Sequence, residues 1–397
     1  MVKLTILSTG FLRHEKDTRG LSVYEIAKNL IKQGVEVEVI APADPKTKSE
    51  ETIDQIKTSR FNYFYPKSMQ KLAYGAGIPS NLKKSILARL QLPFFTSSFI
   101  LKSIGRCKHS DIIHAQWILS GLVGIITKFF YNKPVFLTVR RIVHKSGLMK
   151  EINKFIIENV DYVFFNSTFT QKKVLEFARP KKHSVLHPTL DTNKFNPNLK
   201  SDIRNKLGID KNKKIIFSLG LLVEKKGFNH LIKAISLLDK KVRDNFVLII
   251  GGQGSEKQKL VKLITNLNLQ DNIKLVGEIN SKETPLYYNL ADLFILPSII
   301  DSKGETETFG VVLIEAMACG CPVIASNVGG IPDIVTPEVG FLVEQKNPEQ
   351  IAEKIIHLLK NPSLMKKMSS SARKRIVTNF NSDKVGEELI KHYKQLQ

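Results

Sequence analysis

The stretch DLFILPSIIDSKGETETFGVVLIEAMACGCPVIAS, residues 292–326, decides the fold of this chain. Its first apolar run, DLFILPS, predicts a strand that ends in a polar loop. The loop leads into a predicted helix that begins near Phe309 and Gly310 and ends at Gly320, and CPVIAS predicts a second buried strand. A helix that follows a strand in this way presents free backbone N–H groups and the positive end of its dipole, which suits a phosphate.

Two carboxylates flank this junction. Glu307 lies in the loop, and Glu315 lies about a turn and a half inside the predicted helix. Because like charges repel, neither carboxylate suits phosphate oxygens, and hydroxyl groups on either side of a diphosphate are better partners. A sugar on one side and a ribose on the other would satisfy both residues, so the stretch outlines a nucleotide-sugar site.

Strand-like and helix-like segments alternate on both sides of a polar boundary at 191–214. Strands are predicted at 3–10, 35–42, 111–117, 134–139, 161–166 and 183–188, and again at 214–220, 246–254 and 272–279. This alternation predicts parallel, doubly wound sheets, which bind ligands outside the carboxyl ends of their strands. A chain of 397 residues is too long for one typical core. We therefore predict an α/β fold of two Rossmann-like domains facing a cleft, residues 1–190 and 191–379, with an amphipathic helix at 380–397 that can pack back on the first.

The composition is that of an ordinary globular protein, with 42% apolar and 24% charged residues. No run of eighteen apolar residues occurs, and the N-terminal MVKLTILSTG has a strand pattern rather than that of a signal peptide. The three cysteines, Cys107, Cys319 and Cys321, are too few for a disulfide framework or a zinc site, and the last two suit packing at a helix end. These features predict a cytoplasmic protein without a metal site.

The net charge of +23 is unevenly distributed. Residues 1–200 hold 32 lysines and arginines against 15 acids, whereas the remainder holds 28 against 22. Within 55–150 there are 16 basic residues and a single acid, Asp111. A field of this sign attracts nucleic acid, anionic lipid headgroups or polyanionic substrates.

The basic region contains two predicted helices, 83–92 and 96–106, whose apolar faces are edged by lysine and arginine. This pattern is typical of a helix that lies in a bilayer interface, and it also fits an ordinary core-facing pair of helices. The lack of acids favours an anionic membrane surface. Nucleic acid is an unlikely partner, because no RNA- or DNA-binding module is recognisable and the aromatic residues form no stacking array.

Three further turns suit a nucleotide, although each is unspecific alone. The turn from Gly220 to Gly227 contains Lys226, which can act as a point charge on a diphosphate. The sequence GGQG at 251–254 is a glycine-rich turn without the spacing of the dinucleotide fingerprint. Gly277 and Ile279 end a strand at the same sheet edge, where backbone can contact a base.

The order of these segments resembles the retaining glycosyltransferases of family 4, also called group 1, which have the GT-B fold. GLLVEKKGF (220–228) resembles the family's G-R-L-x-x-x-K-G turn, and ETFGVVLIEAMACGCPVIAS (307–326) resembles its E-x7-E signature. In the first half, the segment with Gly20 (19–42) resembles the N-terminal loop, helix and strand, and the segment with His114 (111–124) resembles the H-A-H-W motif. HPTLDTNKFNP (187–197) resembles the linker, so the similarity covers nearly the whole chain.

The resemblance implies a role for each site residue. Glu307 would hold sugar hydroxyls close to the reacting carbon, and Glu315 would hold the ribose. Lys226, the second catalytic residue, would neutralise the diphosphate as it leaves. The remaining donor-binding residues would be Gly220, Gly277, Ile279 and the backbone of Phe309, Gly310 and Val311. Such enzymes need no metal or cofactor beyond the nucleoside diphosphate sugar, because lysine and helix dipoles stabilise the leaving diphosphate.

The chain departs from the family pattern mainly in its first half and linker. Leu221 replaces the phosphate-binding arginine, which Arg140 or Arg141 can replace from the other domain. The segment 140–143 lacks the family's glycine and aspartate, and Gln116 replaces the second histidine of H-A-H-W. We assign Gly20, His114, Arg140 and Arg141 to the acceptor or cleft side. His114 ends its predicted strand on the cleft side, although a lone histidine is more often structural than catalytic.

These observations predict a retaining hexosyltransferase that moves a sugar to a saccharide or lipid-linked acceptor, in polysaccharide or glycolipid biosynthesis. We expect it in the cytoplasm, peripheral at the inner face of the membrane. One alternative is a non-catalytic sugar-nucleotide-binding protein of the same fold, which Leu221 favours. Another is a sugar-nucleotide epimerase, which would form product without an acceptor. The sequence does not indicate the base, the sugar, the acceptor or the linkage.

Overall fold

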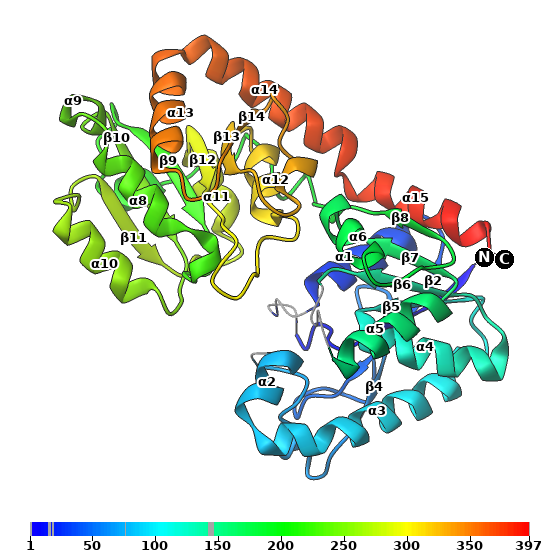
Figure 1. Ribbon diagram of the computed structural model, residues 1–397. Coiled ribbons are helices and arrows are strands. Elements are labelled where there is room, and N and C mark those ends of the chain that lie inside the picture. Colours follow the sequence, from blue (N-terminus) through cyan, green and yellow to red (C-terminus); the bar gives the residue numbers. More distant parts are fainter. Residues whose placement is uncertain (1, 15–16, 18–19, 76, 142–146, 397) are drawn as a thin grey trace. The chain divides into compact units, whose positions relative to one another are not determined.

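The computed structural model describes residues 2–14, 17, 20–75, 77–141 and 147–396. The chain divides into two compact units (Figure 1). The first contains Met1–His187 together with Ser382–Gln397, and the second contains Pro188–Asn381. Each unit is an α/β structure built on a sheet of mainly parallel strands. Among the described residues, no helix is both long and apolar enough to cross a membrane.

The first unit contains an eight-stranded sheet with the order β3-β4-β2-β1-β5-β6-β7-β8. Its strands are β1 Lys3–Ser8, β2 Glu36–Pro42, β3 Glu50–Ile53, β4 Ile56–Phe61, β5 Ile112–Gln116, β6 Val135–Val139, β7 Tyr162–Phe165 and β8 His183–Val185. The strands pair in parallel except for β3, which forms an antiparallel hairpin with β4. Sequence patterns did not predict this hairpin, because its turn residues Asp54 and Gln55 lack the glycine that usually marks such turns.

Helices cover both faces of this sheet. They are α1 Leu21–Lys32, α2 Ile78–Lys84, α3 Ile86–Cys107, α4 Ile118–Tyr131, α5 Leu148–Asn159, α6 Thr168–Leu175 and α15 Ser382–Lys394, with a 3-10 turn at Lys67–Met69. Neighbouring residues of β6 point to opposite faces, as strand geometry requires. Leu137 packs with Phe95 of α3 on one face, and Phe136 packs with Leu389 of α15 on the other.

Helix α3 is one continuous helix, so the prediction of two helices at 83–92 and 96–106 was wrong. Pro93 lies inside it and donates no backbone hydrogen bond, a loss that costs about 3 kcal/mol in an isolated helix. Tertiary packing compensates for that loss, because Phe95 and Phe99 of the following turns are fully buried. Phe99 stacks on Phe61 of β4 with ring centroids 4.6 Å apart. This face of α3 is therefore core-facing.

The second unit contains a six-stranded parallel sheet with the order β11-β10-β9-β12-β13-β14. Its strands are β9 Lys214–Leu219, β10 Phe246–Gly251, β11 Ile273–Gly277, β12 Leu293–Leu296, β13 Val323–Ser326 and β14 Gly340–Val343. Its helices are α7 Ile203–Lys206, α8 Phe228–Ser236, α9 Lys240–Arg243, α10 Lys257–Asn266, α11 Thr284–Leu290, α12 Val311–Ala318, α13 Pro348–Lys360 and α14 Pro362–Asn379. Two 3-10 turns, η2 Glu224–Lys226 and η3 Ile331–Asp333, complete this unit.

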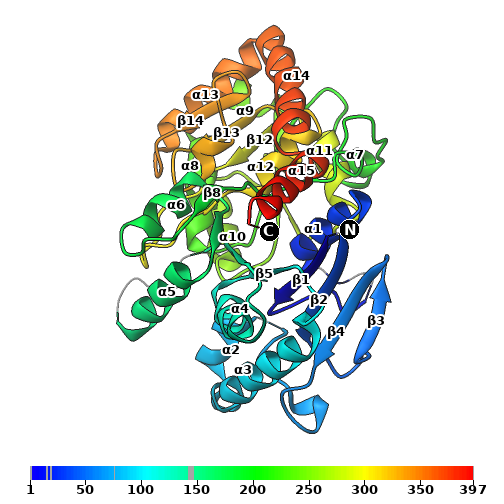
Figure 2. The same cartoon turned by 90° about the vertical axis from the view of Figure 1, so that its right-hand side faces the viewer.

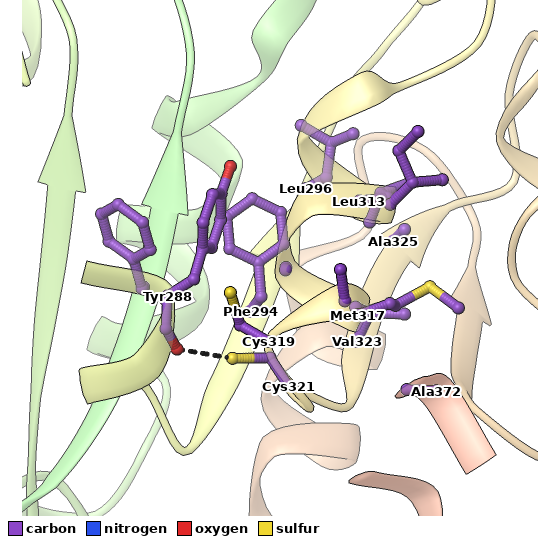
Figure 3. Packing of buried hydrophobic residues seen from close by; sticks show 14 of the residues in the cluster. Tyr288, Phe294, Leu296, Leu313, Met317, Cys319, Cys321, Val323, Ala325 and Ala372 are labelled. Carbon is purple, nitrogen blue, oxygen red and sulfur yellow. Dashed lines mark hydrogen bonds between the residues drawn. The ribbon is translucent and has the colours of Figure 1, made fainter. Parts of the chain in front are cut away.

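Helix α12, which was predicted from the opening stretch, is anchored in the core of the second unit (Figure 3). Its residues Leu313 and Met317 are fully buried in the same cluster as Val323 of β13. Beyond its end, Cys319 and Cys321 are buried free thiols, and Cys321 Sγ donates to the carbonyl of Tyr288 at 2.9 Å. The interpretation of these two cysteines as packing residues is therefore confirmed.

The C-terminal helix α15 packs against α1 in the first unit (Figure 2). Asn29 Nδ2 donates to Asp383 Oδ1 at 2.7 Å, and Gln33 Nε2 donates to the carbonyl of Asp383 at 2.8 Å. Gly386 makes this approach possible, because a Cβ at that position would lie 1.8 Å from Asn29 Oδ1. The last helix of the chain is thus part of the first unit.

Replacing Gly386 by alanine should destabilise the first unit. The added methyl group has no space against α1, and such overpacking costs about 1 to 3 kcal/mol. Urea unfolding followed by the fluorescence of the single tryptophan, Trp117, measures this unit alone, since Trp117 lies in it. Gly105→Ala in α3 is the control, because a Cβ there meets nothing within 4 Å. It should be neutral or stabilising, and equal effects of the two substitutions would contradict the packing.

Candidate functional site

The two residues predicted to be catalytic lie together in the second unit. Lys226 ends the η2 turn that follows β9, and Glu307 lies in the loop between β12 and α12. Lys226 Nζ donates to Glu307 Oε2, although 81 residues separate them in the chain. Their side chains are only 13% and 18% exposed, so the ion pair is largely shielded from water. Shielding strengthens such a pair relative to one on the open surface.

Two glycines position Lys226. The side chain of Lys226 lies across Gly220, where a Cβ would come within 3.3 Å of Lys226 Cε. Gly227 has a φ of 65°, and a Cβ there would lie 1.9 Å from the carbonyl oxygen of Pro297. Only glycine therefore allows the η2 turn to pack against the end of β12.

The backbone of Glu307 is held by a turn after β13 that sequence reasoning missed. The Gly330 N–H donates to the carbonyl of Glu307 at 3.1 Å. A Cβ at Gly329, whose φ is 58°, would lie 1.7 Å from the same carbonyl oxygen. The double glycine two residues after the predicted strand CPVIAS was the signal that could have identified this turn.

The loop that precedes Glu307 is tied to the η2 turn. Asp301 Oδ1 accepts from the backbone N–H groups of Lys303 and Glu305, which closes the loop on itself. The carboxylate of Glu224 accepts from the Ser302 N–H at 3.0 Å and from its hydroxyl at 2.7 Å. These hydrogen bonds therefore fix the backbone that carries Glu307 relative to the turn that carries Lys226.

Helix α12 begins beside Glu307 with an arrangement that suits an anion. Gly310 occupies the N-cap position with a φ of 107°, and within the described part of the chain no side chain caps the helix. Buried Phe309 anchors this end, while Val311 is 43% exposed. At the other end, Arg373 Nη1 donates to the carbonyl of Ala318 at 2.8 Å, which places a cation on the negative end of the helix dipole. The uncapped N–H groups and the positive dipole end are thus left for a ligand.

Glu315 lies further inside α12 in a different environment. Tyr288 donates from its hydroxyl to Glu315 Oε2 at 2.8 Å. Burial raises the pKa of the Glu315 carboxyl to about 7, against the opposing effects of the Tyr288 hydrogen bond and the charge of Lys194. This carboxyl is therefore partly protonated near neutral pH and can both donate and accept hydrogen bonds there.

Gly277 and Ile279, which were predicted to lie by the base, are found at the end of β11, beside the glycine turns that follow β9 and β10. The Gly252 N–H donates to the carbonyl of Gly277 at 2.6 Å, and a Cβ at Gly252 would lie 1.9 Å from the oxygen of Gly220. A Cβ at Gly251 would lie 2.5 Å from Ile279 Cδ1. The glycines of this turn thus allow close backbone packing.

His114 requires a correction, because it does not end its strand. Strand β5 continues to Gln116, and the side chain of His114 is fully buried. Its Nδ1 lies 2.6 Å from Tyr393 Oη and its Nε2 lies 2.8 Å from Thr138 Oγ1. Burial, with the nearby charge of Arg140, lowers the pKa of His114 to about 3, so the ring is neutral. The structure therefore gives His114 a structural position inside the first unit.

The other predicted residues of the first unit lie at or near its loops. Gly20 precedes α1 with a φ of 75°, and a Cβ there would lie 2.7 Å from the oxygen of Gly10. Arg140 directly follows β6 and is half-buried, whereas Arg141 is exposed. The rest of the altered segment, 142–143, lies outside the described residues. Among the residues that are described, no group of three His, Cys, Asp or Glu side chains is placed to hold a metal ion.

Comparison with known proteins identifies the class that this fold and site define. The sequence profile described as "Glycosyltransferase Family 4" matches residues 20–194, and the profile described as "Glycosyl transferases group 1" matches residues 200–375. The chain therefore belongs to the group 1 glycosyltransferases of family 4, which confirms the resemblance read from its motifs.

Similar proteins include an archaeal and a bacterial relative. A Methanocaldococcus jannaschii protein described as an uncharacterized glycosyltransferase is 27% identical over 300 residues, which are 72% of this chain and 75% of the relative. A GDP-mannose-dependent monoacylated alpha-(1-6)-phosphatidylinositol monomannoside mannosyltransferase of Corynebacterium glutamicum is 32% identical over 235 residues. That alignment covers 58% of this chain and 61% of the relative.

Solved structures share the fold over the whole chain. Sucrose-phosphate synthase from Thermosynechococcus elongatus has a TM-score of 0.80 at 22% identity, covering 100% of this chain and 99% of that chain. Anabaena HepE, solved in complex with UDP, has a TM-score of 0.76 at 20% identity, covering 100% of both chains. The predicted GT-B fold is therefore confirmed.

Replacing Glu315 by glutamine should flatten the pH dependence of stability. Since burial raises the folded-state pKa from 4.5 to about 7, the folded chain keeps a proton that the unfolded chain releases. The stability contributed by this carboxyl is complete below pH 4.5 and is lost as the pH rises through about 7. Urea unfolding followed by circular dichroism at about pH 5 and about pH 8 measures the effect.

The difference between the free energies of unfolding of the wild type and Glu315→Gln should be larger at about pH 5 than at about pH 8. The exposed residue Glu349 provides the control, and Glu349→Gln should show no such fall. A difference that stays constant or rises for Glu315→Gln would contradict the buried, protonated carboxyl.

Proposed function

We propose that this glycosyltransferase moves a hexosyl group from a nucleoside diphosphate sugar to a saccharide or lipid-linked acceptor, with retention of the anomeric configuration. One observation carries the proposal: the shielded ion pair of Lys226 and Glu307 lies beside the uncapped start of α12. A cation, a carboxylate and a helix N-terminus together match a diphosphate joined to a sugar.

Lys226 and the start of α12 stabilise the leaving group in this mechanism. As the bond from the anomeric carbon to the diphosphate breaks, negative charge develops on the diphosphate. Fixed charges and dipoles stabilise such charge most effectively where water is excluded, and here Lys226 is 13% exposed. No metal or cofactor takes part in the proposed reaction.

Glu307 positions the sugar in this mechanism. Its carboxylate accepts hydrogen bonds from sugar hydroxyls once Lys226 turns to the diphosphate. The acceptor hydroxyl attacks the anomeric carbon on the face that the diphosphate leaves, and the departing phosphate oxygen takes the proton. Attack on this face gives retention without a covalent intermediate on Glu307.

The nucleoside would extend along the same edge of the sheet. Glu315 binds the ribose hydroxyls, and Gly277 and Ile279 lie beside the base. Support for a nucleotide comes from the names of similar proteins, one described as GDP-mannose-dependent and another solved with UDP. Because these names differ in their base, the proposal leaves the base open. A panel of nucleoside diphosphates tested by thermal shift would identify it, since ligand binding stabilises the folded state.

Replacing either residue of the ion pair by alanine should abolish most activity. Glu307→Ala removes the contact to sugar hydroxyls, and Lys226→Ala removes the cation for the diphosphate. Loss of one preorganised charged contact lowers kcat by about a hundredfold to a thousandfold. The measurement is release of nucleoside diphosphate from a panel of nucleotide sugars, first without and then with saccharide acceptors.

Lys225 supplies the matched control, because it is the neighbouring lysine and pairs with Glu305 at 3.6 Å on the outside of the same turn. Lys225→Ala should keep nearly wild-type activity. Full activity in Glu307→Ala or Lys226→Ala would overturn the proposed mechanism. Tight nucleotide binding without any turnover would favour the non-catalytic alternative. The exposed Leu221, which replaces the family's arginine, also favours that alternative. Epimerised nucleotide sugar formed without acceptor would indicate an epimerase.

We further propose that the first unit lies on an anionic membrane surface at the inner face of the membrane. The outer face of α3 exposes four large apolar side chains, Ile86, Leu90, Phe94 and Leu101, at 73%, 63%, 57% and 71%. Their helical spacing places them on one stripe, opposite the buried face of the same helix. An exposed apolar stripe of this kind is typical of an interaction surface.

The charge near this stripe favours an anionic bilayer. Lys83 and Lys84 end α2, and Arg89 lies in the first turns of α3. The surrounding segment 55–150 holds 16 basic residues and one acid. Apolar insertion and basic side chains together bind anionic lipid, since each basic residue near the surface contributes about 1 kcal/mol.

Serine substitution of Ile86 and Leu90 together should weaken vesicle binding by about tenfold or more, because less apolar area enters the interface. Co-sedimentation with phosphatidylserine vesicles measures the effect, with phosphatidylcholine vesicles for comparison. Leu237→Ser with Val261→Ser, at residues 54% and 46% exposed in the second unit, is the matched control. Wild-type protein that fails to bind phosphatidylserine vesicles even at low salt would overturn this proposal.

A further inference from the structure

A chain of hydrogen-bonded side chains runs through the first unit from its C-terminal helix to Arg140. Tyr393 of α15 contacts His114 Nδ1 at 2.6 Å, and Gln116 Nε2 lies 3.3 Å from His114 Nε2. Gln116 Oε1 in turn accepts from Arg140 Nη2 at 2.9 Å. His114, Gln116 and Tyr393 are buried, so this chain fixes the orientation of the guanidinium group.

The direction of these hydrogen bonds is determined by Arg140. Because the guanidinium only donates, Gln116 must accept with Oε1 and turn its NH2 group towards His114. His114 Nε2 is therefore the accepting nitrogen, and the proton lies on Nδ1, where it is donated to Tyr393 Oη. This assignment agrees with the neutral ring indicated by the low pKa of His114.

Arg140 itself is incompletely satisfied. Its Nε is buried and has no hydrogen-bond partner in the described part of the chain, and no described carboxylate pairs with it. Burial lowers the pKa of Arg140 to about 10, yet the group stays cationic at neutral pH. A half-buried cation whose hydrogen-bond partner among the described residues is a neutral amide is unfavourable unless an anion compensates it.

Trp117 lies next to this cation in a strained conformation. The Arg140 Cζ atom is 5.8 Å from the centre of the indole ring. Trp117 has a φ of 78°, which is rare for a bulky residue and is typical of functional sites, and its side chain is 39% exposed. In the first turn of α4, which Trp117 precedes, Ser120 Oγ is a second buried atom without a partner among the described residues.

We propose that Arg140 and Trp117 bind the acceptor, with Arg140 contacting a phosphate group on it and Trp117 contacting the adjoining sugar or apolar group. This inference rests on the proposed function and specifies its acceptor as anionic. Arg140 is half-buried and presents the planar donor geometry that suits phosphate oxygens. The exposed face of an indole suits a sugar ring or an apolar chain.

We assign this phosphate to the acceptor because Arg140 belongs to the first unit, and competition with a nucleoside diphosphate tests this against the earlier expectation that Arg140 contacts the donor. The groups proposed to hold the donor diphosphate, Lys226 and the start of α12, belong to the second unit. Arg140 and Trp117 follow adjacent strands, β6 and β5, at one edge of the sheet of the first unit. The carboxyl ends of parallel strands are where such sheets bind ligands.

The single tryptophan of the chain is Trp117, so its fluorescence reports on this site directly. Inorganic phosphate is titrated at constant ionic strength, with chloride as the balancing anion. The wild type should show a saturable change in fluorescence. Arg140→Gln should weaken the apparent affinity by about tenfold or more, because hydrogen bonds between a charged donor and a phosphate are among the strongest in proteins.

Two variants serve as controls for the titration. Arg179→Gln removes an exposed arginine whose side chain, among the described residues, bonds the backbone carbonyls of Leu175 and Ala178, and it should leave the response unchanged. Lys226→Ala removes the donor-site cation and should also leave it unchanged. If Arg140→Gln does not fold, Arg140→Lys keeps the charge without the planar donor fork and should still weaken the response.

Four results would overturn the inference. A response that does not saturate would show that phosphate binds only weakly and unspecifically. A response that is unchanged in the Arg140 variants, or lost in Lys226→Ala, would place the phosphate elsewhere. Loss of the response in the presence of a saturating nucleoside diphosphate would assign Arg140 to the donor. Since the titration requires no turnover, failure here leaves the proposed transferase reaction standing, and absence of turnover leaves the phosphate site standing.

Discussion

The ion pair of Lys226 and Glu307 is the interaction on which the proposed donor site of the second unit depends. A turn after β9 carries the lysine and a loop after β12 carries the carboxylate, so the order of the parallel sheet brings them to one edge. Backbone contacts at Gly227 and Gly329, too close for any side chain, lock the turn and the loop in place. The start of α12, which no described side chain caps, then places backbone N–H groups beside these two opposite charges.

The two carboxylates of the site differ in their surroundings. Glu307 is paired with a cation, whereas Glu315 is bonded to a tyrosine hydroxyl in a buried environment that raises its pKa to about 7. Paired with Lys226, Glu307 can exchange its cation for sugar hydroxyls when a diphosphate arrives. Glu315 suits neutral hydroxyl partners both before and after the diphosphate binds. Two acids on one short segment of chain are therefore suited to different parts of one ligand.

Much of this site could be predicted because its determinants are local. A strand, a polar loop and a helix can be recognised from residues 292–326 alone, and Lys226 follows a strand in the same way. The sequence-based predictions that were wrong concern features that depend on distant parts of the chain. His114 is buried because β5 continues past it and because Tyr393 arrives from the last helix, 279 residues away. Helix α3 continues through Pro93 because β4 packs against its aromatic residues. Neither effect is visible in local periodicity.

The central claim is that a nucleoside diphosphate binds at the start of α12 beside Lys226. Backbone hydrogen exchange, measured with and without the nucleoside diphosphate that stabilises the protein most, tests it directly. We expect slower exchange at residues 309–313 and around Lys226, where N–H groups and the cation meet the phosphates. Protection confined to other segments of the chain, or no protection at concentrations that stabilise the protein, would contradict it.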